Sequence, residues 1–160
     1  MKEDNLQANG TKIRIITNMG DFMLQLYDEM PITGGNFQKL VEKGYYDGTI
    51  FHRIIDGFMI QGGDPTATGC GGPGYTITDE FTDHNRNNRG TISMANAGPN
   101  TGGSQFFINL ADNNYLDKAH PVFGEVIEGM GVIDKIGRVR TDAKDRSIID
   151  VKILSARVIP

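Results

Sequence analysis

The sequence predicts a mostly β protein, built as an antiparallel barrel or sandwich. Short strand-like segments recur along the chain, turn-forming residues separate them, and only two segments show a helical pattern. The 21 glycines suit a protein of many turns, and 160 residues fit one domain with a sizeable core.

The N-terminal part is predicted to be a β-hairpin followed by a helix. Residues 12–17 and 22–27 read as strands, and the polar residues between them form a turn. Pro31 is expected to open the helix because proline suits a first helical turn, and Gly44 is expected to end it. Between them, an apolar stripe at helical spacing consists of Phe37, Leu40 and Val41.

The remainder of the chain is predicted to consist of short strands and one short helix. The expected helix covers 130–136. In the last expected strand, apolar residues alternate with Asp150 and Lys152. The expected strands are 50–55, 58–61, 75–78, 90–95, 105–110, 121–126 and 148–159.

The composition argues against several classes of partner. The net charge is −4 and no basic stripe is present, so nucleic acid is not expected. No apolar run approaches the ~20 residues that span a bilayer, so no membrane is expected. Residues 1–10, expected to be a flexible leader, lack the apolar stretch of a signal peptide. A cytoplasmic location is expected, and a monomer is the default.

Neither a metal nor a nucleotide cofactor is predicted. No two histidines have metal-ligand spacing, and Cys70 has no neighbouring cysteine or histidine. The glycine-rich segment 69–74 formally matches a dinucleotide-binding pattern. A proline interrupts it, however, and the β-prone segment 75–78 follows where that motif needs a helix.

Two neighbouring segments, 51–64 and 93–110, hold most residues of chemical interest. Together they offer one arginine, several amide side chains and a cluster of Phe and Met. They contain no obvious nucleophile–base pair. This combination predicts a site that binds and polarises a neutral group rather than one that breaks bonds.

Strand alternation leaves two side chains with more than one interpretation. Phe107 shares a face with Gln105 and Asn109, opposite a uniformly apolar face that belongs in the core. It is either an ordinary exposed aromatic or the wall of a groove. Arg53 lies in an otherwise apolar segment. It is either at a sheet edge, paired with a carboxylate, or held over a groove as an always-charged donor.

The segments 51–64, 93–110 and 121–126 resemble the cyclophilins, a family of peptidyl-prolyl cis–trans isomerases. The motifs FHRII-GFMIQGGD and SMANAGP-T-GSQFFI carry the resemblance, which runs from about residue 12 to 158. It implies a closed eight-stranded antiparallel β-barrel capped by two helices, with a proline-binding groove on its outer wall. Residues 11–160 are then a single isomerase domain.

The resemblance also implies roles for individual residues. Arg53 matches the catalytic arginine of the family, and no cofactor is needed. Tyr115 stands where the best-known members have a tryptophan, so cyclosporin binding is expected to be weakened. The residues implied in substrate binding are Phe58, Met59, Gln61, Ala95, Asn96, Ala97, Gln105, Phe107, Tyr115, Leu116 and His120.

The function implied is acceleration of rotation about X-Pro peptide bonds, which would assist protein folding. Proline-containing peptides and client proteins, unfolded or native, are the expected partners. The alternative is a non-catalytic module that recognises proline-containing segments of a partner protein. Such a module would keep the apolar groove, but it would not need the cation of Arg53.

Overall fold

The computed structural model describes residues 10–160. The predicted leader lies outside the described residues, apart from Gly10. Within the described range, no helix is long and apolar enough to cross a membrane. The elements are β1 Lys12–Thr17, β2 Gly20–Leu26, α2 Pro31–Glu42, β3 Arg53–Ile55, β4 Met59–Gly62, β5 Thr91–Met94, β6 Phe106–Asn109, the 3-10 helix η1 Asn114–Leu116, β7 Val122–Glu128, α3 Met130–Gly137 and β8 Ile153–Ile159.

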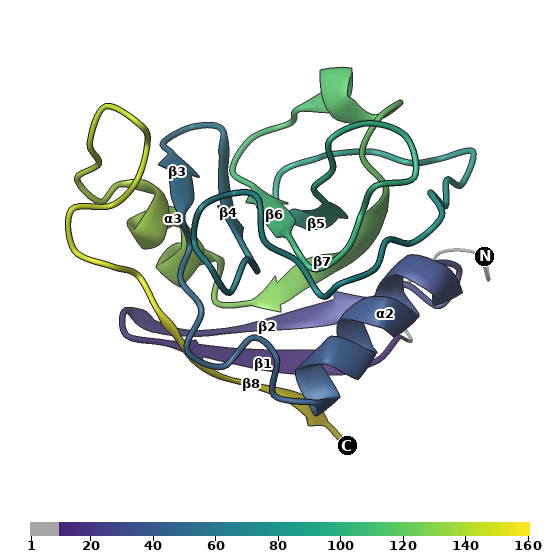
Figure 1. Cartoon of the computed structure of the whole chain (residues 1–160), viewed down its shortest axis with the longest axis horizontal. Coiled ribbons are helices and arrows are strands. Elements are labelled where there is room, and N and C mark those ends of the chain that lie inside the picture. The colour runs from purple at the N-terminus through teal and green to yellow at the C-terminus, as the bar shows by residue number, and fades with distance from the viewer. Residues whose placement is uncertain (1–9) are drawn as a thin grey trace.

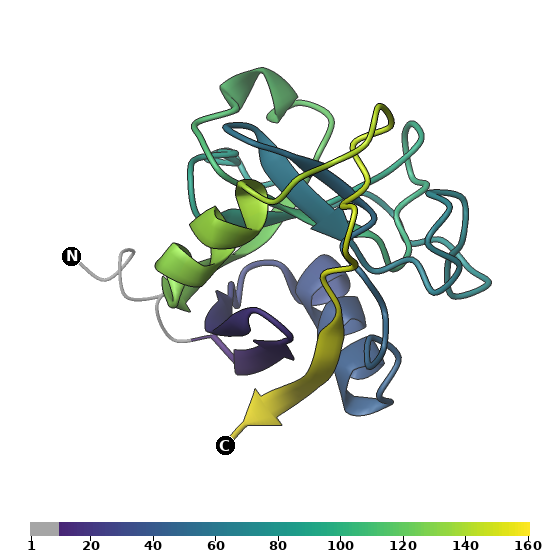
Figure 2. The ribbon, with the colours of Figure 1, turned by 90° about the vertical axis from the view of Figure 1, so that its left-hand side faces the viewer.

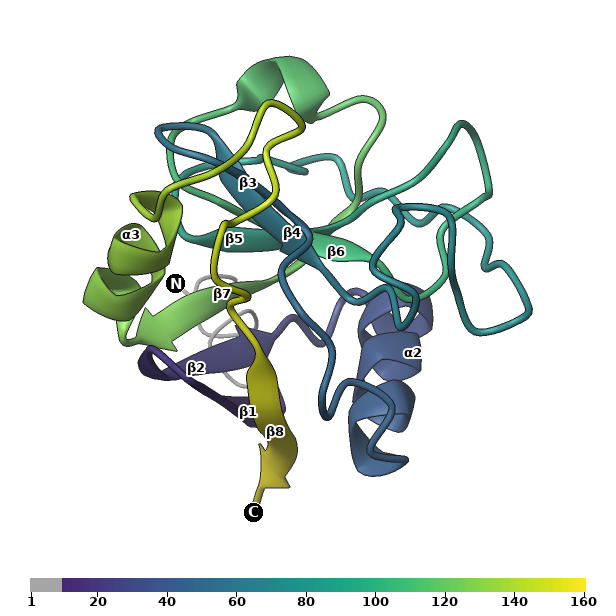
Figure 3. The same ribbon diagram turned by 60° about the vertical axis from the view of Figure 1, so that its left-hand side comes forward.

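In residues 10–160, eight strands form one antiparallel sheet in the order β3-β4-β6-β5-β7-β2-β1-β8. The sheet curls, and β1, β2 and β8 lie together below the other strands (Figure 1). The two α-helices lie at opposite ends of the curled sheet (Figure 3). The mostly β, two-helix prediction is therefore confirmed.

The prediction of a closed barrel is wrong, because the sheet is open. The end strands β3 and β8 are not joined by a ladder, although the curl brings their segments near each other (Figure 2). One isolated bridge joins Ile50 to Lys152, and the Phe51 amide donates to the Val151 carbonyl at 3.0 Å. β3 has only 3 residues and β8 begins at Ile153, beyond the bridge at Lys152, so the two strands share no ladder.

The helix α2 covers the core of the curled sheet. Pro31 is in its first turn as predicted, and Gly44, with φ of 72°, lies just beyond its last residues. Phe37 is fully buried and its ring contacts Phe106 and Phe123 at centroid distances of 5.5 and 5.1 Å. These aromatic contacts fix the back of β6, whose other face carries Phe107.

Two of the strand predictions fail. Residues 75–78 form no strand, and only Ile77 makes a bridge, with Gly102. The last strand begins at Ile153 rather than at residue 148, and Ile149 is 81% exposed. In both places a β-prone sequence has no partner strand beside it, and strand propensity depends on that context.

Candidate active site

The strand register aligns several predicted site residues across the sheet. Arg53 of β3 lies opposite Gln61 of β4, and Gln61 lies opposite Phe107 of β6. Phe107 in turn lies opposite Ser93 of β5. Because directly opposed residues point to the same face, these side chains form one row on the outer side of the sheet.

A cavity of about 260 Å³ opens along this row, and we call it the first cavity. Its apolar wall includes Met59 and Phe107, which are only 2% and 4% exposed. The interpretation of Phe107 as an ordinary exposed aromatic is therefore wrong. The lining residues are Arg53, Phe58, Met59, Gln61, Ala95, Asn96, Phe107, Leu116 and His120.

Arg53 supplies the positive charge of the first cavity. Its side chain is exposed, and its Nη1 donates to Gln61 Oε1 at 3.5 Å. Among the described residues, no carboxylate pairs with it. Arg53 thus lies on an edge strand and also beside the cavity, with its charge available to a ligand.

His120 and Asn96 form one rim of the first cavity. The His120 ring packs edge-on against Phe107, with centroids 5.2 Å apart and planes at 84°. Its Nδ1 lies 3.0 Å from the Met94 carbonyl, which can only accept, so Nδ1 carries the hydrogen and donates. Asn96 Nδ2 donates to the Ala119 carbonyl at 2.8 Å.

A second cavity, of about 560 Å³, adjoins the first. Gln61, Ala95 and Asn96 line both cavities, whereas Ala97 and Gln105 line only the second. Most of its remaining wall comes from the glycine-rich segment 69–74, from the next two residues, Tyr75 and Thr76, and from Thr101, Gly103 and Ser104. Main-chain groups and small side chains therefore dominate its surface.

A chain of amide hydrogen bonds connects the two cavities. Gln61 Nε2 donates to Gln105 Oε1 at 3.0 Å. Gln105 Nε2 then donates to the carbonyls of Gly69 and Gly71 at 2.9 and 3.0 Å. Since Gln61 also accepts from Arg53, the position of the glycine-rich segment is coupled to that of the arginine.

Asp64 organises the start of the glycine-rich segment. Its carboxylate is fully buried and accepts from the amides of Thr66, Thr68, Gly69 and Gly71. Burial alone would raise the pKa of Asp64, but the hydrogen bonds outweigh it and hold the pKa well below its usual range. A Cβ on Gly71 would lie 2.0 Å from Asp64 Oδ1, so this position requires glycine.

Tyr115 is the one predicted site residue that lines neither cavity. It is 74% exposed, and its ring stacks on Phe58 at a centroid distance of 6.2 Å. Through Phe58 it supports the edge of the first cavity. Its implied contact with substrate or cyclosporin stays a prediction.

The sequence reading missed the polar residues behind the site. Asn87, Ser93 and Asn109 are all 0% exposed, and Asn113 is 5% exposed. Strand alternation predicts that Asn109 faces away from the core, but loops cover that face and bury it. In the described part of the chain, no group of three or more His, Cys, Asp or Glu side chains could hold a metal ion.

Comparison with known proteins identifies the family. The model of the cyclophilin type peptidyl-prolyl cis-trans isomerase/CLD family matches residues 12–158. Peptidyl-prolyl cis-trans isomerase-like 1 of Neurospora crassa is 52% identical, covering 93% of this chain and 94% of its own. The mouse protein of the same name is 50% identical, with coverages of 88% and 87%.

Solved structures agree with these sequence matches. A Cryptosporidium parvum cyclophilin type peptidyl-prolyl cis-trans isomerase superposes with a TM-score of 0.90 at 37% identity, covering 94% of this chain and 98% of its own. A second crystal structure of that protein, in the presence of the dipeptide Ala-Pro, also gives 0.90, at 38% identity with coverages of 93% and 99%. This chain therefore belongs to the cyclophilin-type peptidyl-prolyl cis–trans isomerases, enzymes that bind proline-containing peptides.

Proposed function

We propose that the first cavity is the catalytic site of this isomerase and that Arg53 is its catalytic residue. The observation that carries the proposal is an exposed guanidinium beside an apolar cavity, with no carboxylate paired to it among residues 10–160. The proline ring would pack against Phe58, Met59, Phe107 and Leu116. That arrangement aims the charge at the X-Pro amide.

The reaction is rotation about a partial double bond, so it needs no nucleophile. The barrier is about 18–20 kcal/mol, and uncatalysed exchange takes tens to hundreds of seconds. Raising a rate of ~10⁻² s⁻¹ to ~10³ s⁻¹ requires lowering that barrier by about 7 kcal/mol. A site that binds both ends of the amide and stabilises its twisted form meets this requirement without covalent chemistry.

Arg53 would act on the twisted form of the amide. As the amide rotates, the lone pair of the proline nitrogen is released from resonance and becomes an acceptor. A donor positioned for charge that develops only in the transition state is worth about 3–4 kcal/mol. The hydrogen bond from Arg53 to Gln61, at 3.5 Å, is long and leaves most donors of the guanidinium available.

The second cavity would hold the residues that precede the proline. Ala95 and Asn96 line both cavities, and Ala97 and Gln105 line the second. Binding of the preceding residues would confine rotation to the single X-Pro bond. The wall of glycines and small side chains suits varied side chains in a substrate, as expected of an enzyme with many clients.

We further propose that the enzyme assists protein folding in the cytoplasm, as a monomeric chaperone acting on exposed X-Pro bonds of unfolded or native clients. The openness of the second cavity to varied residues supports a general role. The alternative, a non-catalytic proline-binding module, would use the same two cavities. Arg53 favours the enzyme, since recognition of an apolar ring does not need a cation.

The test is cis-to-trans exchange of a short Ala-Pro peptide, measured for wild type and Arg53→Ala. Removing one preorganised donor is expected to lower kcat/KM by about 10²–10³-fold. The variant should stay folded, because Arg53 is exposed. Arg140→Ala, an equal loss of charge at another exposed position, is the matched control and should leave the rate unchanged.

Two outcomes would contradict this proposal. Peptide binding without any exchange faster than in buffer would indicate the recognition module. A bell-shaped profile of kcat/KM between pH 6 and 9 would point to His120 as the reacting group, since an arginine stays charged throughout that range.

Cyclosporin binding provides a separate check on Tyr115. We propose that the drug binds weakly, because a tyrosine replaces the tryptophan of the best-known cyclophilins. Tyr115→Trp is expected to tighten binding by roughly tenfold, within the range that aromatic contacts provide. Titration calorimetry on both proteins measures this, and equal affinities would show that Tyr115 does not limit binding.

A further inference from the structure

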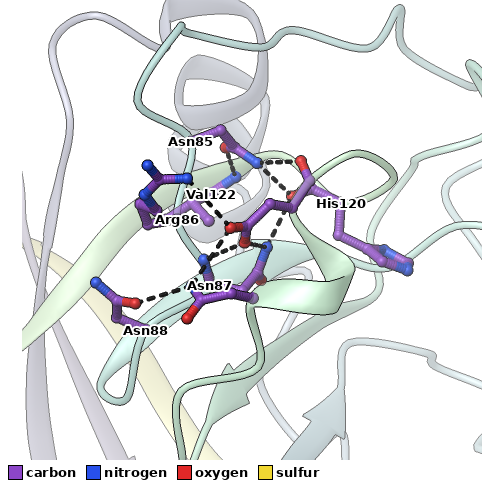
Figure 4. A network of polar contacts seen from close by, with 8 residues as sticks. Asn85, Arg86, Asn87, Asn88, His120 and Val122 are labelled. Carbon is purple, nitrogen blue, oxygen red and sulfur yellow. Dashed lines mark hydrogen bonds and ion pairs between the residues drawn. The ribbon is translucent and has the colours of Figure 1, made fainter.

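A network of polar side chains, several of them asparagines, surrounds the main chain of His120 (Figure 4). At its centre, Asn87 is 0% exposed. Its backbone amide donates to Asp117 Oδ1 at 2.6 Å, and its side-chain Nδ2 donates to the same oxygen and to the His120 carbonyl, both at 3.2 Å. One residue thus holds two points of the loop that carries Leu116 and His120.

Asn85 holds the same loop from a neighbouring position. Its Nδ2 donates to the carbonyls of Asp117 and His120 at 2.8 and 3.0 Å, and its Oδ1 accepts from the Val122 amide at 2.8 Å. The His120 carbonyl therefore accepts from two asparagines. In Figure 4 this carbonyl faces the network while the imidazole points away from it, toward the cavity rim.

The other side of Asn87 is anchored in the sheet. Its Oδ1 accepts from Ser93 Oγ at 2.5 Å and from Asn109 Nδ2 at 3.1 Å. Ser93 lies opposite Phe107 in the register, and Asn109 lies two residues beyond it on β6. Asn87 therefore connects β5 and β6, the strand that carries Phe107, to the loop that carries His120.

The network also reaches the opposite wall of the first cavity. Asn113 Nδ2 donates to Asn109 Oδ1 and to the Phe58 carbonyl, both at 2.9 Å. The Asn113 amide donates to the Asn87 carbonyl at 2.7 Å. Phe58 at one wall and His120 at the other are thus connected through three buried asparagines.

We propose that Asn87 is a positioning residue for the isomerase reaction, which fixes the spacing between the Phe58–Phe107 wall and the loop bearing Leu116 and His120. This inference rests on the proposed role of the first cavity. The loop has little regular structure of its own, with only the 3 residues of η1, so the side-chain hydrogen bonds of Asn85 and Asn87 add to the few main-chain hydrogen bonds that hold it. Among the residues that line the cavity, the hydrogen bonds of the Asn87 side chain reach only the carbonyl of His120.

The test compares Asn87→Asp with Asn88→Asp in the full chain. Asn87→Asp keeps the shape and the Oδ1 acceptor, but it places an oxygen against Asp117 Oδ1 and the His120 carbonyl, where the amide now donates. Asn88 is exposed, and its Oδ1 accepts from Asn114, a contact that a carboxylate keeps. The control therefore makes the same chemical change one residue away.

We expect kcat/KM for an Ala-Pro peptide to fall about 10- to 100-fold in Asn87→Asp and to stay unchanged in Asn88→Asp, since a displacement near 1 Å costs up to roughly 100-fold. Melting curves and peptide binding show whether the protein is folded. The charged group in contact with Asn87 is the carboxylate of Asp117, and the Nη1 of Arg86 lies 3.7 Å from the other oxygen of that carboxylate. Near Asp117 a buried carboxylate has a raised pKa, so lowering the pH from 8 to 5 restores its donor and the variant-to-wild-type activity ratio should rise.

A folded Asn87→Asp with wild-type kcat/KM at all pH values would overturn the inference. If this variant unfolds, Asn87→Ser, which adds no charge but cannot reach His120, is expected to lose several-fold activity while folded, and full activity would again overturn it. Unfolding of both variants would assign Asn87 to the whole fold and reject a specific positioning role. Inactivity of the wild type itself would instead reject the proposed function.

Discussion

The two adjoining cavities differ in what their walls are made of. In the first, large buried side chains such as Met59 and Phe107 form the surface, and one arginine supplies charge. In the second, glycines and main-chain groups form it, held from below by the carboxylate of Asp64. The first can therefore select one side chain by shape, while the second binds a chain with little regard to its side chains.

Of the substitutions that test this difference between the cavities, Phe107→Ala is expected to have the largest effect on stability and on peptide exchange. Phe107→Ala removes a large part of the apolar wall of the first cavity, and it removes the ring that packs edge-on against His120. Phe-to-Ala changes in cores cost about 3–5 kcal/mol, and the lower end applies because one side of this ring borders the cavity. Urea unfolding should show a loss of about 3 kcal/mol, and peptide exchange should slow at least tenfold.

Phe81→Ala is the matched control for that experiment. Phe81 is 43% exposed and lines neither cavity, so its loss should change stability by less than about 1 kcal/mol and leave peptide exchange as in wild type. Equal effects of the two substitutions would mean that the apolar wall contributes only general packing. The contrast between a shape-selective cavity and a main-chain cavity would then fail.

Asp64→Asn tests the second cavity with a smaller expected loss. The amide keeps one acceptor oxygen but turns donors toward the amides of Thr68, Gly69 or Gly71. Buried groups left unsatisfied in this way cost about 2–3 kcal/mol at pH 7. Because the second cavity would bind ground state and transition state alike, KM should rise more than kcat falls.

The depressed pKa of Asp64 predicts how the stability difference between wild type and Asp64→Asn changes with pH. The folded-state pKa of Asp64 is depressed, so its contribution is fully present above the unfolded pKa of about 3.9 and is lost as pH falls through the folded value. The stability difference between wild type and variant should therefore shrink between pH 5 and 2. Asp56→Asn, at an exposed position, is the control. A stability difference that stays constant with pH would contradict the proposal that the ionised carboxylate of Asp64 stabilises the glycine-rich segment.

Most of the strands and the residues of the first cavity could be predicted from the sequence, whereas the burial of some of these residues could not. Period-two alternation and turn signals predicted most strands, and the motif resemblance predicted which residues gather at the first cavity. The burial of Asn109 and Phe107 could not be predicted, because it depends on loops 85–89 and 113–120 covering the outer face of β6. Strand alternation alone does not show which loops cover a face.

Sheet closure could not be predicted for a related reason. Whether β3 and β8 pair depends on segments about 100 residues apart, and the alternation in residues 148–159 predicted a strand five residues too early. Val151 and Ile153 are buried as that alternation predicts, whereas Ile149 is exposed. Short-range patterns thus identified the strands, while long-range packing set their ends.

A third cavity, of about 400 Å³, is lined mostly by charged and polar side chains and so differs from the other two. A substitution there is expected to have the smallest effect on stability and activity. The lining of this cavity includes His84, whose Nε2 lies 2.5 Å from Glu29 Oε1 and whose Nδ1 lies 2.9 Å from Asp83 Oδ1. These hydrogen bonds, to Asp83 and then to Glu29, raise the pKa of His84. We expect His84→Gln to leave peptide exchange unchanged and to lower stability slightly.

The sign of that loss follows from the raised folded-state pKa. The stabilisation from His84 is fully present below its unfolded pKa of about 6.5 and is lost as pH rises through the folded value. Since the ring is 52% exposed, the difference between wild type and His84→Gln should stay below about 1 kcal/mol. Chemical unfolding at pH 6 and at pH 9 measures it. A difference that grows toward pH 9 would contradict the assignment, and slowed exchange would show that charged groups outside the first two cavities also affect the reaction.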